Sequence, residues 1–231
     1  MNAERALAQI NAEVEKLFAA LKPVAAGFGH VAGISGRIVR EDLIDIRGAV
    51  SDVLTEHADF VAGCGVIPVP HLLEDAPYWM EWFWSVPDRE PEALRVNLEP
   101  LAPDFFDYTT ADWFVTPLRT RHRHIAGPYV DYVCTNEYAT TLAVPVEVHG
   151  EFVGIAALDV TVSGWERRIL PVLRGIPEAM TLTNASGRVI ASTSAELSPG
   201  QRLDLHDGAA VVGSTAFGWQ LVSDAAALAT R

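Results

Sequence analysis

Two long apolar runs, separated by a short turn, constrain the fold of this chain more than any other feature. Residues 140–148 form the first run, His149-Gly150 the turn, and residues 152–162 the second run. Two strand-length segments joined so closely pair as an antiparallel hairpin, because a parallel crossover needs a dozen or more residues. The sequence therefore predicts an antiparallel sheet that contains this hairpin.

Near the N-terminus the pattern changes to a helical one. Apolar residues recur at alternating spacings of three and four, at Leu7, Ile10, Val14, Leu17 and Leu21. This spacing predicts one long amphipathic helix, which we expect Pro23 to stop. It is also the a/d register of a coiled coil, so the apolar face can either pack on its own domain or form the seam of a homodimer.

The remaining elements follow in order along the chain. A Gly-rich break at 26–36 precedes a second helical pattern, whose apolar face holds Leu43, Ile46, Val50, Val53, Leu54 and His57. Strand-like runs are expected at 60–73, 78–86 and 93–98, before the hairpin. After it come a short helix at 166–173 and short strands at 180–183, 187–193, 209–214 and 219–223.

The predicted order is helices, then an antiparallel sheet, then a smaller β-rich tail. This order indicates an α+β protein. We predict three regions: an N-terminal helical region at 1–58, a ligand-binding module at 59–168, and a small second module at 169–231.

Charge and composition exclude several classes of function. The 231 residues include 17 basic and 30 acidic side chains, a net charge of −13, which argues against a nucleic-acid partner. The longest apolar stretch, 58–73, is interrupted by Asp, Gly, Pro and His and cannot span a membrane. With no secretory signal visible, the expected location is the cytoplasm. Cys64 and Cys134 lack metal-type spacing and are expected as buried thiols.

The motifs of common enzyme classes are missing from the sequence. It contains neither a Gly-rich phosphate loop nor a G-x-S-x-G nucleophile elbow, and no cofactor is expected. His122 and His124 would share a strand face, but flanking arginines repel a cation, so we expect a solvated basic loop and no metal. Asp131 and Asp159 could perform acid–base chemistry, which keeps a small enzyme open as an alternative.

Aromatic and acidic residues are interleaved between residues 79 and 159. In the run 78–84, Tyr78, Met80, Trp82 and Trp84 would share one strand face, while Trp79, Glu81 and Phe83 would share the other. Aromatic rings offer their quadrupole faces to a cation, and carboxylates offer charge-assisted hydrogen bonds. This combination suits a cationic ligand.

Four short segments, in order, resemble the sensor domains of the Cache family, of the double-Cache, PAS-like kind. They are 107–114 (DYTTADWF), 128–131 (PYVD), 141–146 (TLAVPV) and 154–159 (GIAALD), similar to the family's D-x-R-x-R-x-W-Y, P-Y-x-D, T-x-x-x-P-V and G-x-x-x-x-D segments. The resemblance covers about residues 60–162, and the tail from 184 is similar to the start of a truncated second, membrane-proximal module.

The resemblance implies a non-catalytic sensor with a PAS-like pocket for a small molecule. Residue by residue, it implies that Trp113 and Phe114 wall the pocket, while Tyr129, Asp131 and Asp159 hold an ammonium group. Three neighbouring residues complete the candidate ligand site: Trp84, Tyr108 and Asp112.

The chain departs from the family pattern at three positions. Thr109 and Ala111 replace the arginines that would grip a carboxylate, and Phe114 replaces a tyrosine. The resemblance therefore implies recognition of a cationic amine or amino acid, with the ammonium between Asp131 and Asp159. Family members are usually flanked by transmembrane helices, which the sequence does not show at either end.

Other ligands and partners stay open at this stage. The same pocket could bind a small carboxylate if Arg119, Arg121 or Arg123 replaced the missing arginines. A stand-alone sensor would need a separately encoded regulator or transporter as its output partner.

Overall fold

The computed structural model of the chain describes all residues except 35–36, 87–88, 133–136, 204–210 and 224–231. The side chain of Glu137 is also not described. Its helices are α1 (Ala3–Ala32), η1 (Arg40–Ile46), α2 (Arg47–Glu56), η2 (Tyr108–Thr110), α3 (Asp112–Thr120) and α4 (Val162–Leu173). Its strands are β1 (Val61–Pro68), β2 (Glu81–Trp84), β3 (Glu92–Ala93), β4 (His124–Asp131), β5 (Glu137–Val148), β6 (Glu151–Thr161), β7 (Met180–Thr183), β8 (Val189–Ser192), β9 (Val211–Ser214) and β10 (Gln220–Ser223).

The described strands form two antiparallel sheets. The larger has the order β3-β2-β1-β6-β5-β4, and the smaller has the order β8-β7-β10-β9. The predicted hairpin is β5 and β6, at the centre of the larger sheet. A long N-terminal helix, a large antiparallel sheet and a small second sheet confirm the predicted α+β class.

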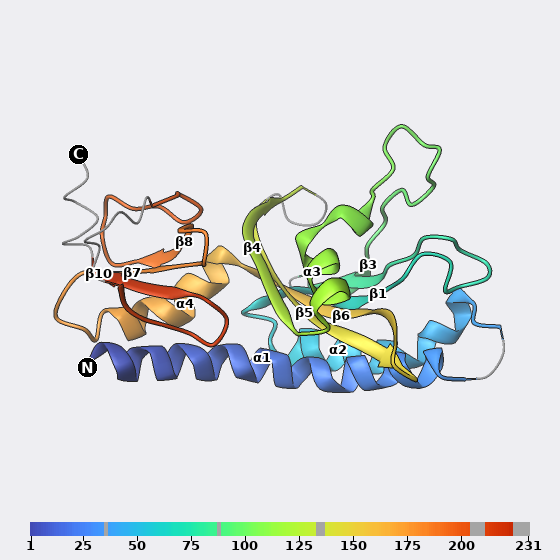
Figure 1. The fold of residues 1–231 in the computed structure, drawn as a ribbon, viewed down its shortest axis with the longest axis horizontal. Coiled ribbons are helices and arrows are strands. Elements are labelled where there is room, and N and C mark those ends of the chain that lie inside the picture. The colour runs from blue at the N-terminus through green and yellow to red at the C-terminus, as the bar shows by residue number, and fades with distance from the viewer. Residues whose placement is uncertain (35–36, 87–88, 133–136, 204–210, 224–231) are drawn as a thin grey trace.

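Helix α1 runs beneath both sheets, as the blue ribbon in Figure 1 shows. Asn2 caps its N-terminus, because the Asn2 side chain accepts a hydrogen bond of 3.0 Å from the Arg5 backbone N–H. The prediction that Pro23 stops this helix is wrong, since the helix continues to Ala32. A proline inside a helix costs about 3 kcal/mol. Val24, Phe28 and Val31 beyond it are buried, and each contributes roughly 1.5–3 kcal/mol, so their burial outweighs that cost.

The predicted Gly-rich break at 26–36 is likewise helical as far as Ala32. Two of its glycines lie where other elements approach closely. A Cβ at Gly27 would lie 3.0 Å from the Ile46 side chain, and one at Gly29 would lie 3.4 Å from Val146. These glycines therefore serve helix packing, and residues 35–36 of the predicted break fall outside the described part of the chain.

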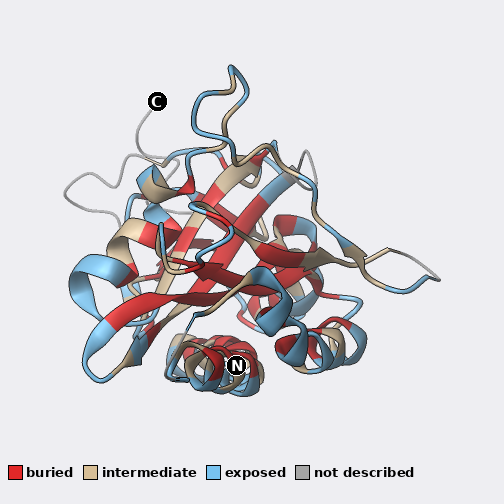
Figure 2. Cartoon of the chain, turned by 90° about the vertical axis from the view of Figure 1, so that its right-hand side faces the viewer, coloured by how far each residue is buried: buried red, intermediate tan, exposed pale blue. Residues whose placement is uncertain are grey.

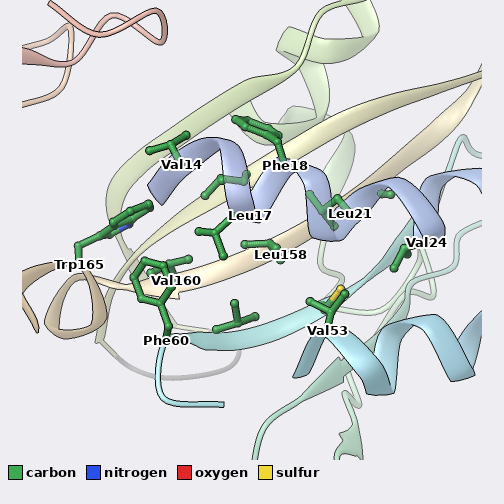
Figure 3. Close-up of a cluster of buried hydrophobic side chains, with 14 of the residues drawn as sticks. Val14, Leu17, Phe18, Leu21, Val24, Val53, Phe60, Leu158, Val160 and Trp165 are labelled. Atoms are coloured by element: carbon green, nitrogen blue, oxygen red, sulfur yellow. The ribbon is translucent and has the colours of Figure 1, made fainter. Parts of the chain in front are cut away.

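The apolar face of α1 lies in the hydrophobic core. Figure 3 shows Val14, Leu17 and Leu21 packed over Leu158 and Val160 of β6. All five a/d residues are buried within the chain, at 8% exposure or less. Of the two predicted roles, packing on the helix's own domain is therefore confirmed, and this face is not free to form a dimer seam. In the end-on view of Figure 2, α1 lies beneath the large sheet.

Several other predicted elements differ in extent. The second helical pattern begins as the 3-10 helix η1 and becomes α-helical only at Arg47, with Leu43, Ile46, Val50, Val53 and Leu54 buried. The runs at 60–73, 78–86 and 93–98 contain the shorter strands β1, β2 and part of β3. Helix α4 begins at Val162, inside the predicted second hairpin strand. Cys64 is buried and free, whereas Cys134 and residues 209–210 lie outside the described residues.

Candidate functional site

A cavity of about 580 Å³ lies on the face of the large sheet opposite α1. The sheet, the first turn of α3 and the segments that carry Leu94 and Phe106 form its walls. Five of the predicted site residues line it, namely Asp112, Trp113, Tyr129, Asp131 and Asp159. The structure thus brings together residues from α3, β4 and β6 that are far apart in the sequence.

The strands leave room for this cavity because their side chains on that face are small. Gly65 of β1 pairs with Ala157 of β6, which pairs with Ala143 of β5. Ala126 and Gly127 of β4 line the cavity directly. Gly127 has a φ of +100°, and a Cβ there would lie 2.7 Å from the Ala139 carbonyl oxygen, so glycine is required at this position.

A chain of hydrogen bonds crosses the sheet and ends on Asp159. Thr141 of β5 lies directly opposite Asp159 of β6 in the register. The Thr141 hydroxyl donates to Asp159 Oδ1 at 2.6 Å and lies 2.5 Å from the Tyr129 hydroxyl. Because the single Thr141 proton goes to Asp159, Tyr129 is the donor in the second bond. Three strands therefore orient one carboxylate in the cavity wall.

Burial is the main reason that Asp159 has an unusual acidity. Burial and, to a smaller extent, the nearby Asp131 carboxylate raise the pKa of this carboxyl to about 7, although the hydrogen bond from Thr141 lowers it. Both aspartates are only 6% exposed. A cation placed between them would favour the charged form of Asp159.

Asp112 lies in the cavity wall at the start of α3, but its carboxylate is already engaged. Oδ1 accepts from the Thr116 hydroxyl at 2.7 Å, and Oδ2 lies 2.8 Å from His124 Nε2. Burial would raise the pKa of Asp112, but these hydrogen bonds outweigh it and hold the pKa below its usual value. Asp112 is therefore a charged group that also ties α3 to the first residue of β4.

Three predicted site residues do not line the cavity. Phe114 and Tyr108 lie behind its wall in an edge-to-face cluster, with ring centroids 5.2 Å apart, and the Tyr108 hydroxyl donates to the Pro68 carbonyl at 2.9 Å. Burial raises the pKa of Tyr108 to about 12. Trp84 pairs with Gly63 and Glu92 near the edge of the sheet. Phe114 and Tyr108 support the position of Trp113, which is in contact with Phe114.

The cavity also has lining residues that were not among the predicted site: Ile67, Met80, Trp82, Leu94, Phe106, Ala111, Ala126, Gly127, Val130, Tyr132 and Thr141. Three of these carried a usable signal. The alternation in 78–84 places Met80 and Trp82 on one face, which is the cavity face. Thr141 lies in the T-x-x-x-P-V segment, across the hairpin from Asp159. The side chains of Leu94 and Phe106 come from irregular segments with no such pattern.

The basic segment 119–124 does not line the cavity, and the prediction of a solvated loop is only partly right. Arg123 forms two hydrogen bonds to the Glu15 carboxylate, at 2.6 and 2.7 Å, and its guanidinium lies 4.8 Å from the centroids of both the Phe18 and Phe217 rings. Arg121 lies over the Phe152 ring and 3.7 Å from the Glu147 carboxylate. His124 is the first residue of β4.

The described residues lack the features of a metal site and of a membrane-spanning helix. No three His, Cys, Asp or Glu side chains among them gather closely enough to hold a metal ion. None of the described helices combines the length and the hydropathy that a membrane crossing requires.

Comparison with known proteins places this geometry in a known fold. Residues 92–165 match the sequence model of the family described as methyl-accepting chemotaxis protein-like, first PDC sensor domain. The ligand-binding domain of the Campylobacter jejuni chemoreceptor Tlp3, solved with L-norvaline, superposes with a TM-score of 0.62 at 13% identity, covering 95% of this chain and 86% of that domain. The chain has a Cache-type, or PDC-type, sensor fold.

Other solved structures agree with this assignment of the Cache-type fold. The Tlp3 sensory domain with isoleucine bound has a TM-score of 0.61 at 13% identity and covers 95% of this chain and 87% of that one. A protein described as methyl-accepting chemotaxis protein X has a TM-score of 0.58 at 16% identity, covering 90% of this chain and 78% of that one. No curated protein matches the sequence. The resemblance stated from the sequence is confirmed at the level of the fold.

Proposed function

We propose that this protein is a non-catalytic small-molecule sensor whose cavity binds a cationic amine or amino acid. The observation that carries the proposal is that two buried carboxylates, Asp131 and Asp159, line the same cavity as Trp113 and Tyr129. An ammonium group between these two carboxylates would form charge-assisted hydrogen bonds with both of them. The Tlp3 domains of the same fold, solved with L-norvaline and isoleucine, support a ligand of this kind.

In this proposal each group has a defined role. Asp131 and Asp159 accept hydrogen bonds from the ammonium, Thr141 and Tyr129 fix the orientation of Asp159, and the Trp113 ring packs on the carbon skeleton. None of these roles includes a bond-breaking step, so the proposal needs no cofactor. The second interpretation, a carboxylate held by Arg119, Arg121 or Arg123, is weakened because none of the three lines the cavity.

We also propose the division into regions 1–58, 59–168 and 169–231. The strands of the large sheet fall within 61–161 and those of the small sheet within 180–223, which supports the division. A separately encoded regulator or transporter and a cytoplasmic location stay predictions from the sequence.

The test is the thermal shift and the binding isotherm of the purified protein with a panel of small amines and amino acids. A ligand at 100 times its dissociation constant should stabilise the folded state by about 2.7 kcal/mol. Asp131→Asn and Asp159→Asn should each abolish the shift. Asp52→Asn, an exposed position on α2, is the matched control and should respond like the parent. If both cavity variants respond like the parent, the assignment of ligand binding to Asp131 and Asp159 is wrong.

A further inference from the structure

The cavity has three acidic side chains and no basic one among its described lining residues. Asp112, Asp131 and Asp159 line it, without lysine, arginine or histidine. The electrostatic potential inside is therefore negative, which attracts an ammonium and repels a carboxylate.

At one of the two positions where the resemblance to the Cache family implies an arginine, the chain has a methyl group. Ala111 lines the cavity immediately before α3. Thr109, two residues earlier, is turned to Asp107, whose carboxylate accepts from both its backbone N–H and its hydroxyl at 3.0 and 2.5 Å. Neither side chain can supply the positive charge that a buried carboxylate requires.

Two of the three arginines at 119–123 are held elsewhere. Arg123 is bound to Glu15 on α1, and Arg121 lies over Phe152 and near Glu147. For either guanidinium to enter the cavity it would have to leave these partners. Such a movement is unfavourable for Arg123, because it would lose the bidentate pair with Glu15 and the contacts with the Phe18 and Phe217 rings.

The rest of the lining is apolar. Ile67, Met80, Trp82, Leu94 and Phe106 surround the part of the cavity beyond the aspartates. Apolar walls stabilise a hydrocarbon or aromatic group by removing its surface from water. A carboxylate in the same place would lose its hydration without gaining a partner.

We propose that the ligand is an amine with an apolar body and no carboxylate, rather than an amino acid. The inference rests on the proposed function and narrows its ligand class: the ammonium lies at Asp131 and Asp159, and the apolar body fills the space between Trp82, Trp113 and Phe106.

The experiment compares molecules that differ only in the carboxylate. Isothermal titration is run with isoamylamine, L-leucine and L-leucinamide, and with phenethylamine, L-phenylalanine and L-phenylalaninamide. Each amine should bind at least tenfold more tightly than its amino acid, and each amide should bind like the amine, because neutralising the carboxylate removes the repulsion. An amino acid that binds as tightly as its amine, or more tightly, overturns the inference. If no member of either series binds, the proposed function itself fails.

A gain-of-function variant makes the test independent of the parent's affinities. Ala111 is only partly buried, so a longer side chain has room there. Ala111→Arg should raise the affinity for the amino acid relative to the amine at least tenfold. Ala111→Gln, of similar length but neutral, should leave that ratio as in the parent. An equal effect of both variants on the ratio would contradict the proposed role of charge. Since the amine-to-amino-acid ratio of the parent is measured separately, a variant that fails to fold leaves the inference falsifiable.

Discussion

The two faces of the large sheet carry the same strands and have opposite roles. On β5 and β6, Leu142 pairs with Leu158 on the face that α1 covers. The adjacent pair, Thr141 of β5 and Asp159 of β6, lies on the cavity face. The first pair is part of a continuous hydrophobic core. The second pair is polar and borders an open space.

This difference shows how one hairpin can provide both stability and a binding site. Successive side chains of a strand point to opposite faces, so neighbouring residues meet different surroundings. The α1 face is filled by large apolar side chains, whereas the cavity face also carries the polar side chains of Thr141, Asp131 and Asp159. We therefore expect substitutions on the first face to change the free energy of unfolding and those on the second to change ligand binding.

The largest effect should come from neighbouring substitutions on opposite faces. Leu158→Ala removes a fully buried side chain and should reduce the free energy of unfolding by about 3–5 kcal/mol, because it leaves a cavity in the core. Asp159→Asn, one residue along, should leave that free energy unchanged or raise it at neutral pH, because it removes a buried carboxylate. Urea denaturation of the three proteins measures both effects. Equal destabilisation by the two substitutions would show that the faces do not differ.

A smaller effect is expected from pH, and it should arise on the cavity face alone. The pKa of Asp159 is about 7 in the folded chain and near 4 in the unfolded chain. Between these values the folded state keeps a proton that the unfolded state has lost. Stability should therefore fall by about 1 kcal/mol per pH unit from about pH 4 to pH 7 and change no further above it.

The parent is compared with Asp159→Asn in urea at a series of pH values from 4 to 8. The difference between the two curves isolates Asp159, since other carboxyl groups, such as Asp112, contribute equally to both. Parallel curves would contradict the assignment of the raised pKa to this residue.

The smallest of these effects tests a contact between the cavity strand and the small sheet. Asn184, after β7, donates from Nδ2 to the carbonyl of Gly127 in β4 at 2.6 Å, while its Oδ1 accepts from Ser186 and Arg188. Asn184→Asp keeps the acceptor and removes the donor, so it should destabilise the chain by about 1 kcal/mol. Ser186→Ala, which removes a hydroxyl donor from the same turn, is the control. No change in the thermal midpoint of Asn184→Asp would show that the contact between the sheets is unimportant for stability.

The elements that the sequence predicted best are those with a regular pattern of apolar residues. Strands β5, β6 and β7, helix α1 and the two faces of segment 78–84 follow from periods of 2 and 3.6. The elements it missed are α3 and β4. Helix α3 has nine residues with Pro117 inside it, and β4 contains Gly127 and Pro128, so neither shows a continuous period.

The candidate site was predicted in part for a similar reason. Trp113, Tyr129, Asp131 and Asp159 were found through short segments that resemble a known family, and all four line the cavity. Phe114, Tyr108 and Trp84 come from the same aromatic region but do not line the cavity. An aromatic residue in the sequence does not reveal whether its ring faces the cavity or the packed wall behind it.

By itself the sequence determined the hairpin, the helical character of the N-terminus and the α+β class. Only the tertiary structure decided which polar residues meet. The register of β5 and β6 shifts by one residue between Val146 and Glu147, close to Gly154, whose φ is +145°. Without that irregularity, Asp159 would lie opposite Thr140, whose hydroxyl is bonded instead to Trp165 at 2.7 Å. A one-residue shift exchanges the faces of a strand, and neither the turn nor the apolar pattern specifies it.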